Sequence, residues 1–336
     1  MRWIQTRFFG AHRLPLLFAV LCGWSAPSQA GILPGALVSA AWLHDHLSSV
    51  QIVDVREDTD SLSTPPVWTT AQGHKPVLRQ VGGFIAGARS LDFWSLRGTR
   101  TFDGHPLGFV FPDAARFTRL MQQADVHANR PIVITPTGDD AASLQEAAYL
   151  ALELRVYGVP QDQVAILNGG LHAWIQAGYP VTVDTIMPMR SSHFTARPVH
   201  TDWIVHTAAV EAAQQAGTQL LDARPLSEYV GVEKSPIIPR LGRLAGARAL
   251  PAEALYFRAS DGAWYFMNAA NNARVLAVLQ LQPAANAIVY CNTGQYAAGA
   301  WFILHEILGM TGVREYPGSL YAWLAHGLPV TGLDPD

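Results

Sequence analysis

Short apolar runs recur along the chain and indicate strands that are buried on both faces. The clearest runs are residues 52–53, 132–134 and 164–167, and they lack the alternation of polar and apolar side chains that a half-exposed strand shows. Segments with helical spacing, such as 41–47 and 208–216, lie between runs of this kind. Because strands and helices alternate, we expect the α/β fold class with parallel sheets flanked by helices.

This pattern occurs twice in the same order. The sequence Val-Asp-Val-Arg at 53–56 recurs as Leu-Asp-Ala-Arg at 221–224. Three further blocks recur after it: 85–91 matches 244–250, 132–138 matches 288–294, and 168–174 matches 317–323. Four repeated blocks in one order indicate two copies of the same α/β unit, and hence two tandem domains.

We place the first domain at residues 31–183 and the second at 201–336. Residues 184–200 contain Pro188, Pro198 and two serines without any hydrophobic periodicity. A segment of this composition is typical of a connection between domains, so we interpret it as the linker.

The first thirty residues, 1–30, have the features of a secretory signal peptide. Three arginines precede an apolar stretch at 14–24 that is too short to span a membrane, and small residues before Gly31 offer a cleavage site. We therefore expect a periplasmic or secreted protein without membrane attachment after cleavage. Removal of the three arginines from 23 basic residues leaves 20 against 26 acidic ones, a net charge of −6. This balance argues against a nucleic-acid partner.

Cleavage would also leave Cys291 as the one cysteine of the chain, because Cys22 lies in the signal segment. Exported proteins use cysteines mostly in disulfides, so a lone thiol is either a small buried residue or a reactive group. An apolar strand at 288–290 ends at Cys291, and a short loop with a glycine leads into a helical segment. Backbone N–H groups and the helix N-terminus would point at the sulfur and lower the pKa of the thiol. Thr135 holds the matching position in the first copy, so we expect only the second copy to react.

On these residues the chain resembles the tandem-domain rhodanese-like sulfurtransferases, the thiosulfate and 3-mercaptopyruvate sulfurtransferase family. The features that carry the resemblance are the strand ending in Cys291, Gly294 in fourth place of the loop, and Gly318-Ser319 followed by Trp323. The resemblance implies two tandem rhodanese-like domains, each a parallel sheet flanked by helices. It further implies an inactive first domain and a catalytic second domain in which Cys291 carries a persulfide. The donor would be a small sulfur anion, thiosulfate or 3-mercaptopyruvate, and the acceptor a thiol or cyanide.

The loop after the cysteine is neutral. It lacks the basic residues common in thiosulfate-selective members and is closer to the loops of mercaptopyruvate-type enzymes. We expect it to bind the substrate and the persulfide through backbone N–H groups, with no dedicated general base, from Asn292, Thr293, Gly294, Gln295 and Tyr296. The histidines of the chain lack the spacing of metal ligands, and no cofactor is expected.

Arg224 is the main candidate for binding the anionic group of the donor, because it follows a strand expected beside the cysteine strand. The alternative is that Arg224 only pairs with Asp222, as Arg56 would pair with Asp54 in the inactive copy. Since the inactive copy keeps the same residues, both roles stay open.

Two other enzyme classes fit the same residues less well. A cysteine phosphatase needs an arginine six positions after the cysteine, where Ala297 stands, and a disulfide oxidoreductase needs a second cysteine. A non-catalytic persulfide carrier or a binding module with the same fold stays open. Arg243 and Arg248 are weaker candidates than Arg224 for reaching the site.

Overall fold

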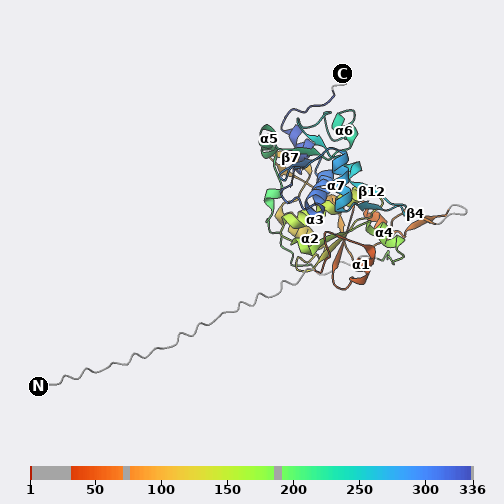
Figure 1. The fold of residues 1–336 in the computed structure, drawn as a ribbon. Helices are drawn as coiled ribbons and strands as arrows, with labels where there is room; N and C mark the ends of the chain where they lie inside the picture. The colour runs from red at the N-terminus through yellow and green to blue at the C-terminus, as the bar shows by residue number, and fades with distance from the viewer. Residues whose placement is uncertain (2–31, 71–75, 185–190, 334–336) are drawn as a thin grey trace. The chain divides into compact units, whose positions relative to one another are not determined.

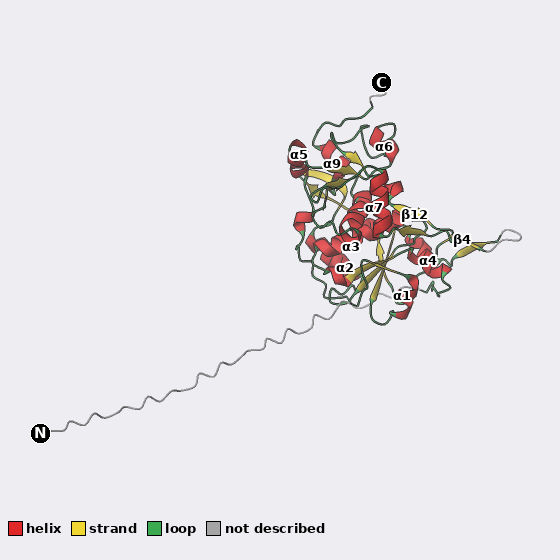
Figure 2. Cartoon of the chain, in the orientation of Figure 1, coloured by secondary structure: helices red, strands yellow, loops and turns green. Residues whose placement is uncertain are grey.

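The computed structural model describes residues 1, 32–70, 76–184 and 191–333, which form two parallel sheets with helices around them (Figures 1 and 2). The predicted signal peptide, apart from Met1, and part of the predicted linker lie outside the described residues. In the part of the chain that the structure describes, no helix is both long enough and apolar enough to cross a membrane.

The first sheet has five parallel strands, which confirms the parallel α/β architecture predicted for this half. The order across the sheet is β1-β9-β8-β2-β5. Their bounds are Leu37–Val38 for β1, Gln51–Arg56 for β2, Arg89–Asp92 for β5, Ile132–Thr135 for β8 and Val164–Leu167 for β9. The residues of β2, β8 and β9 are buried throughout, as the continuous apolar runs in the sequence predict.

The second sheet repeats the order of the first. Its parallel strands run β11-β10-β14-β15, which matches β5-β2-β8-β9 strand for strand. Their bounds are Leu220–Asp222 for β10, Arg248–Ala249 for β11, Ile288–Tyr290 for β14 and Arg314–Glu315 for β15. A single bridge between Ile204 and Glu315 stands where β1 would lie. The sequence repeat is therefore a repeat of one folding unit.

Equivalent helices of the two copies begin with the same kind of cap. In α2, Asp113 accepts a hydrogen bond from the backbone N–H of Arg116 at 2.7 Å; in α7, Asn268 accepts one from the backbone N–H of Asn271 at 2.9 Å.

The helices are α1 Ala40–Asp45, α2 Ala114–Gln123, α3 Ala141–Val156, α4 Gly170–Gln176, α5 Thr207–Gln215, α6 Leu226–Val230, α7 Ala269–Val278, α8 Gln295–Phe302 and α9 Ser319–Ala325. Short turns are η1 Thr59–Ser63, η2 Phe93–Leu96, η3 Gln161–Gln163, η4 Thr201–Trp203, η5 Ala252–Ala254 and the π-turn η6 Ile303–Ile307.

Helices α3 and α8, which follow the equivalent strands β8 and β14, pack against each other at the seam between the copies. Every residue of α3 from Ser143 to Val156 is buried. An amphipathic helix hides one face only, so burial on all sides means that both copies cover α3. The largest apolar cluster accordingly draws residues from both halves.

Each copy also extends a hairpin onto the other copy. The hairpin of the first copy is β6 Gly98–Phe102 with β7 His105–Val110, and that of the second is β12 Tyr256–Arg258 with β13 Trp264–Phe266. At the tip of the first, Asp103 accepts hydrogen bonds from the ring of His206 and the backbone N–H of Thr207, both at 2.7 Å. A third hairpin, β3 Val67–Thr69 with β4 Val77–Gln80, extends from the first copy. This exchange of hairpins brings residues of the first copy to the edge of the second sheet.

Candidate functional site

Cys291 follows β14 directly and lies at the entrance to helix α8. The loop has three residues, and Gly294 caps the helix with φ +94°. The Gly294 N–H donates to Sγ of Cys291 at 3.1 Å. A side chain at Gly294 would be strained at this φ, and its Cβ would lie 3.0 Å from the carbonyl oxygen of Pro317. Glycine therefore allows the loop to curl tightly around the sulfur.

Burial and the backbone N–H groups shift the pKa of the Cys291 thiol in opposite directions. Cys291 is 2 % exposed, and burial raises its pKa above the ordinary value, while the N–H groups of Ala297, Thr293 and Gly294 lower it. Burial has the larger effect, so the net change is upward. The expectation that the loop lowers the pKa below its ordinary value was wrong in direction, because the sequence shows the loop but not how deeply it is buried.

Ser319 supports Cys291 from a second segment. Its Oγ accepts a hydrogen bond from the backbone N–H of Cys291 at 3.0 Å, donates to the carbonyl of Tyr316 at 2.7 Å and lies 3.9 Å from Sγ. Ser319 has φ +50°, a left-handed conformation in which the first copy uses Gly170 at +59°. A strained serine in place of a glycine, found only in the copy with the thiol, indicates a role at the sulfur.

The equivalent loop of the first copy cannot hold a sulfur atom in this way. Five residues separate Thr135 from α3, two more than separate Cys291 from α8. Asp140 caps α3, and the N–H of Gly138 donates to Ser143 Oγ at 3.0 Å instead of pointing at the strand end. The N–H group that would stabilise an anion at position 135 is thus already used.

A cavity of about 370 Å³ opens beside Cys291 between the two copies. Glu57 and Ala142 of the first copy contribute to its wall. The second copy supplies the rest of the lining: Glu228, Glu233, Lys234, Ser235, Pro236, Ile237, Cys291, Asn292, Thr293, Gln295 and Tyr296. The structure thus brings four of the five predicted loop residues to the cavity wall, while Gly294 contributes its N–H from behind the sulfur.

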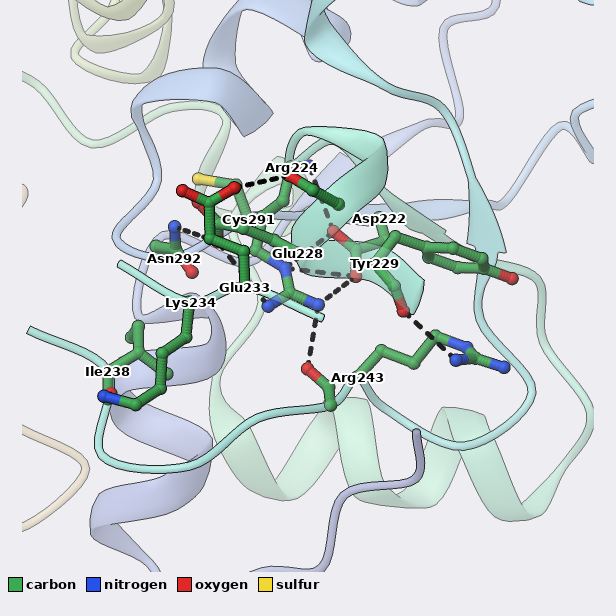
Figure 3. Close-up of polar contacts among 12 residues, drawn as sticks. Asp222, Arg224, Glu228, Tyr229, Glu233, Lys234, Ile238, Arg243, Cys291 and Asn292 are labelled. Atoms are coloured by element: carbon green, nitrogen blue, oxygen red, sulfur yellow. Dashed lines mark hydrogen bonds and ion pairs between the residues drawn. The ribbon is translucent and has the colours of Figure 1, made fainter. Parts of the chain in front are cut away.

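Carboxylates dominate the charge of this cavity. Glu228 is buried and accepts a hydrogen bond from Asn292 Nδ2 at 2.7 Å (Figure 3). Burial raises its pKa above the ordinary value, although Asn292 and Arg224 act to lower it. Glu57 and Glu233 are exposed. Lys234 is the cationic residue of the lining, and its Nζ donates to the carbonyl of Ile238 at 2.9 Å.

Arg224 lies outside the cavity lining, contrary to its predicted role as the residue that binds the donor. It is 1 % exposed. Its Nε and Nη2 donate to the carboxylate of Asp222 at 2.9 and 2.6 Å, and Nη2 also donates to the carbonyl of Gly242 at 3.0 Å (Figure 3). Nη1 lies 3.8 Å from Glu228. The geometry matches the second role expected from the sequence, a structural pair with Asp222.

The pair is repeated in the first copy, where Nε of Arg56 donates to Asp54 at 2.7 Å and Nη2 donates to the Gly83 carbonyl at 3.1 Å. The two weaker candidates are also engaged elsewhere. Arg243 lies over the ring of Tyr229 at 4.4 Å, and Arg248 donates to the carbonyl of Gln280 at 2.9 Å. Neither is part of the cavity lining.

Arg97, a residue of the first copy, holds the Cys291 loop of the second. It follows η2 and is 7 % exposed. Its Nη2 donates to the carbonyl and Oγ1 of Thr293 at 2.6 and 2.7 Å, and its Nη1 donates to Oε1 of Gln295 at 3.1 Å. Four aromatic rings surround the guanidinium at 5.3–5.9 Å, those of Phe93, Trp94, Phe109 and Tyr149. The register of the repeat, 85–91 on 244–250, places Tyr256 at the position equivalent to Arg97, so only the loop with the thiol receives an arginine.

We expect Arg97→Met to lower kcat/KM by about tenfold to a hundredfold, because one or more charge-assisted hydrogen bonds, each contributing about 1.5–3 kcal/mol, are lost. Arg97→Lys should recover part of the activity. Alkylation of Cys291 by iodoacetamide should also change in rate, which reports the state of the loop directly.

Leu255→Met provides a control beside Tyr256, the second-copy position equivalent to Arg97, since a volume-conserving substitution there keeps the packing of the seam. Its kcat/KM should equal that of the unmodified protein. If Arg97→Met lowers the melting temperature but keeps full activity and the original alkylation rate, Arg97 contributes to stability alone.

Sequence reasoning missed Arg97, Ser319 and the carboxylates of the cavity. Ser319 could have been found, because it replaces Gly170 in an otherwise repeated block. Arg97 and Glu57 carry no local signal, since they reach the site from the other copy. Within the described residues, no group of three metal-binding side chains is present.

The model of the rhodanese-like domain matches residues 39–177 and 206–326 of this chain. These two regions make up most of the sequence and coincide with the two copies of the α/β unit. The chain therefore belongs to the rhodanese family, with two rhodanese-like domains in tandem.

The relatives it resembles are named for sulfur transfer or sulfur carriage. A Mycobacterium bovis protein named "Putative thiosulfate sulfurtransferase 1" is 28% identical over 297 residues, covering 87% of this chain and 94% of the relative. The "Sulfur carrier protein TtuD" of Thermus thermophilus is 24% identical over 310 residues, covering 86% and 94%. The chain belongs to this sulfurtransferase and sulfur-carrier class.

Solved structures show the same fold. The anaerobic ergothioneine biosynthesis enzyme from Chlorobium limicola, in complex with trimethyl histidine, aligns with a TM-score of 0.70 at 21% identity, over 89% of this chain and 71% of that chain. A variant of EanB with ergothioneine covalently linked to a persulfide cysteine aligns with a TM-score of 0.70, also at 21% identity, over 90% and 71%.

Proposed function

We propose that this protein is an exported sulfurtransferase that moves a sulfane sulfur from thiosulfate or 3-mercaptopyruvate to a thiol or cyanide through a persulfide on Cys291. The observation that carries the proposal is the Cys291 loop, in which the Gly294 N–H lies 3.1 Å from Sγ at the wall of a cavity. The proposal that the protein is exported rests on the basic and apolar segment at 1–30. The mass of the chain recovered from the periplasm or medium tests it, because cleavage removes the mass of these residues.

The reaction has two steps at one sulfur atom. In the first, the Cys291 thiolate attacks the sulfane sulfur of the donor; the donor bond to that sulfur breaks, and sulfite or pyruvate enolate leaves with the electron pair. In the second, the acceptor takes the terminal sulfur and the electron pair returns to Sγ. The backbone N–H groups of the loop stabilise the persulfide anion between the steps.

Of the two donors, we favour 3-mercaptopyruvate. Thiosulfate is a dianion and 3-mercaptopyruvate carries one carboxylate, while Glu57, Glu228 and Glu233 face the same cavity. The donor with the smaller negative charge is repelled less. The neutral loop, which lacks an arginine or lysine, supports the same choice.

Intact-mass measurement with each donor tests the proposal. We expect the protein to gain the mass of one sulfur atom and to release it to cyanide or a thiol with turnover, with the larger kcat/KM for 3-mercaptopyruvate. Since burial raises the pKa of Cys291, the rate of loading should increase with pH as the thiolate fraction grows. Loading without turnover would favour the alternative, a persulfide carrier, which is also how the Thermus relative is named. The absence of any sulfur adduct with either donor would contradict both.

A further inference from the structure

The cavity beside Cys291 has a charge pattern that bears on the acceptor. Its lining holds three carboxylates, those of Glu57, Glu228 and Glu233, against the single cation of Lys234. Figure 3 shows Glu228 and Glu233 beside Cys291, with Asn292 bound to Glu228. The carboxylates come from both copies, because Glu57 follows β2 of the first sheet and the other two follow β10 of the second.

The cations in and next to this cavity offset only part of its negative charge. Lys234 donates to the carbonyl of Ile238. Arg224, behind Glu228, is paired with Asp222 and almost fully buried. Arg97 is held by Thr293 and Gln295 on the far side of the loop. Among the described residues of the lining, Lys234 is the one cation; it is exposed and makes no ion pair, so it offsets one of the three carboxylates and negative charge remains in excess.

Loading of the cysteine keeps a negative charge at the loop. The persulfide is an anion, as the attacking thiolate is, so the acceptor meets this charge together with those of the carboxylates. A cavity of about 370 Å³ keeps any bound molecule close to the carboxylates that line it. At a separation of about 6–8 Å in water-like surroundings, each charge changes affinity about two- to threefold. Charge selection therefore acts on the acceptor as well as on the donor.

We propose that the physiological acceptor is a small cationic thiol, in which an ammonium or comparable organic cation lies close to the sulfur. This inference rests on the proposed function and deepens it. The acceptor thiolate forms a bond to the terminal sulfur of the persulfide, the bond between that sulfur and Sγ breaks, and the electron pair stays on Sγ as thiolate. The products are the acceptor persulfide and the free enzyme, and no oxidant or reductant is consumed.

Three thiols of similar size test the proposal: cysteamine, which is cationic, 2-mercaptoethanol, which is neutral, and 3-mercaptopropionate, which is anionic. The protein is first loaded with saturating 3-mercaptopyruvate or thiosulfate and desalted, and loading is verified by intact mass. Sulfur release is then followed in single turnover. We expect rates in the order cysteamine, 2-mercaptoethanol, 3-mercaptopropionate. The preference should weaken in 0.5 M salt, where the Debye length is about 4 Å.

Because the three thiols differ in intrinsic reactivity, the decisive quantity is how the ratio of cysteamine to 3-mercaptopropionate rates changes between variants. Glu57→Gln and Glu233→Gln each remove one exposed charge from the lining. A charge that attracts one thiol repels the other, so each variant should lower the ratio about four- to tenfold. Glu211→Gln on α5, which makes the same chemical change away from the cavity, should leave the ratio unchanged.

The outcomes separate the two proposals. A protein that gains no sulfur from either donor contradicts the proposed function itself. A protein that loads normally but keeps the same ratio of rates in Glu57→Gln, Glu233→Gln and Glu211→Gln overturns the cationic acceptor alone. A ratio that falls in the first two variants and not in the third supports it.

Discussion

Cys291→Ser should abolish both sulfur loading and turnover, with a loss of activity of about three orders of magnitude or more. A serine hydroxyl is a far poorer nucleophile than a thiolate and forms no persulfide. Cys291 is the only free cysteine among the described residues, and no other thiol there can replace it. Intact mass after incubation with donor, and turnover with cyanide or a thiol, measure the two effects.

Thr135→Cys in the Cys291→Ser background is the matched control for the loop. It places a thiol at the equivalent strand end of the first copy, but there the Gly138 N–H is bound to Ser143 Oγ and the loop is two residues longer. We expect activity close to that of Cys291→Ser alone. If the double variant recovers a large fraction of the original rate, the first loop can also hold a persulfide. If Cys291→Ser alone remains active, Cys291 is not the residue that accepts sulfur.

Arg224→Ala should destabilise the fold by about 3–5 kcal/mol, because it leaves the carboxylate of Asp222 buried without its partner. Asp222 is 0 % exposed and also accepts a hydrogen bond from Tyr290 at 2.7 Å. For a chain of this size the melting temperature should fall by roughly 5–15 °C. Thermal unfolding of the variant against the unmodified protein measures the loss.

Arg56→Ala is the matched control, since Arg56 makes the same bonds to Asp54 and Gly83 in the copy without a thiol. If both arginines form structural pairs, the two variants should lose equal amounts of stability. Measured well below the melting temperature, the KM for the donor should be unchanged in Arg56→Ala and changed at most slightly in Arg224→Ala. A KM raised tenfold in Arg224→Ala alone would instead restore its predicted contact with the donor.

The amino-acid sequence by itself determined the fold class and the candidate reactive residue. Continuous apolar runs such as 132–134 identify strands that are buried on both faces, and this signal is local, so it survives without a structure. The repeat of four blocks fixed the tandem arrangement, because two copies of one sequence pattern form the same unit twice. Cys291 was found because the strand end, the glycine and the helix all lie within a few residues of it.

Only the tertiary structure decided what surrounds that atom. Arg97 and Glu57 reach the site from the other copy, nearly 200 residues or more away in the chain, and no local pattern marks them. The same is true of burial: the sequence showed Arg224 after a strand, and the fold decided that its guanidinium is enclosed with Asp222 instead of facing the cavity. Packing between distant segments sets burial, and burial raised the pKa of Cys291 where the loop alone would have lowered it. Contacts between the two copies therefore set the charge and the support of a site whose candidate nucleophile the sequence had already located.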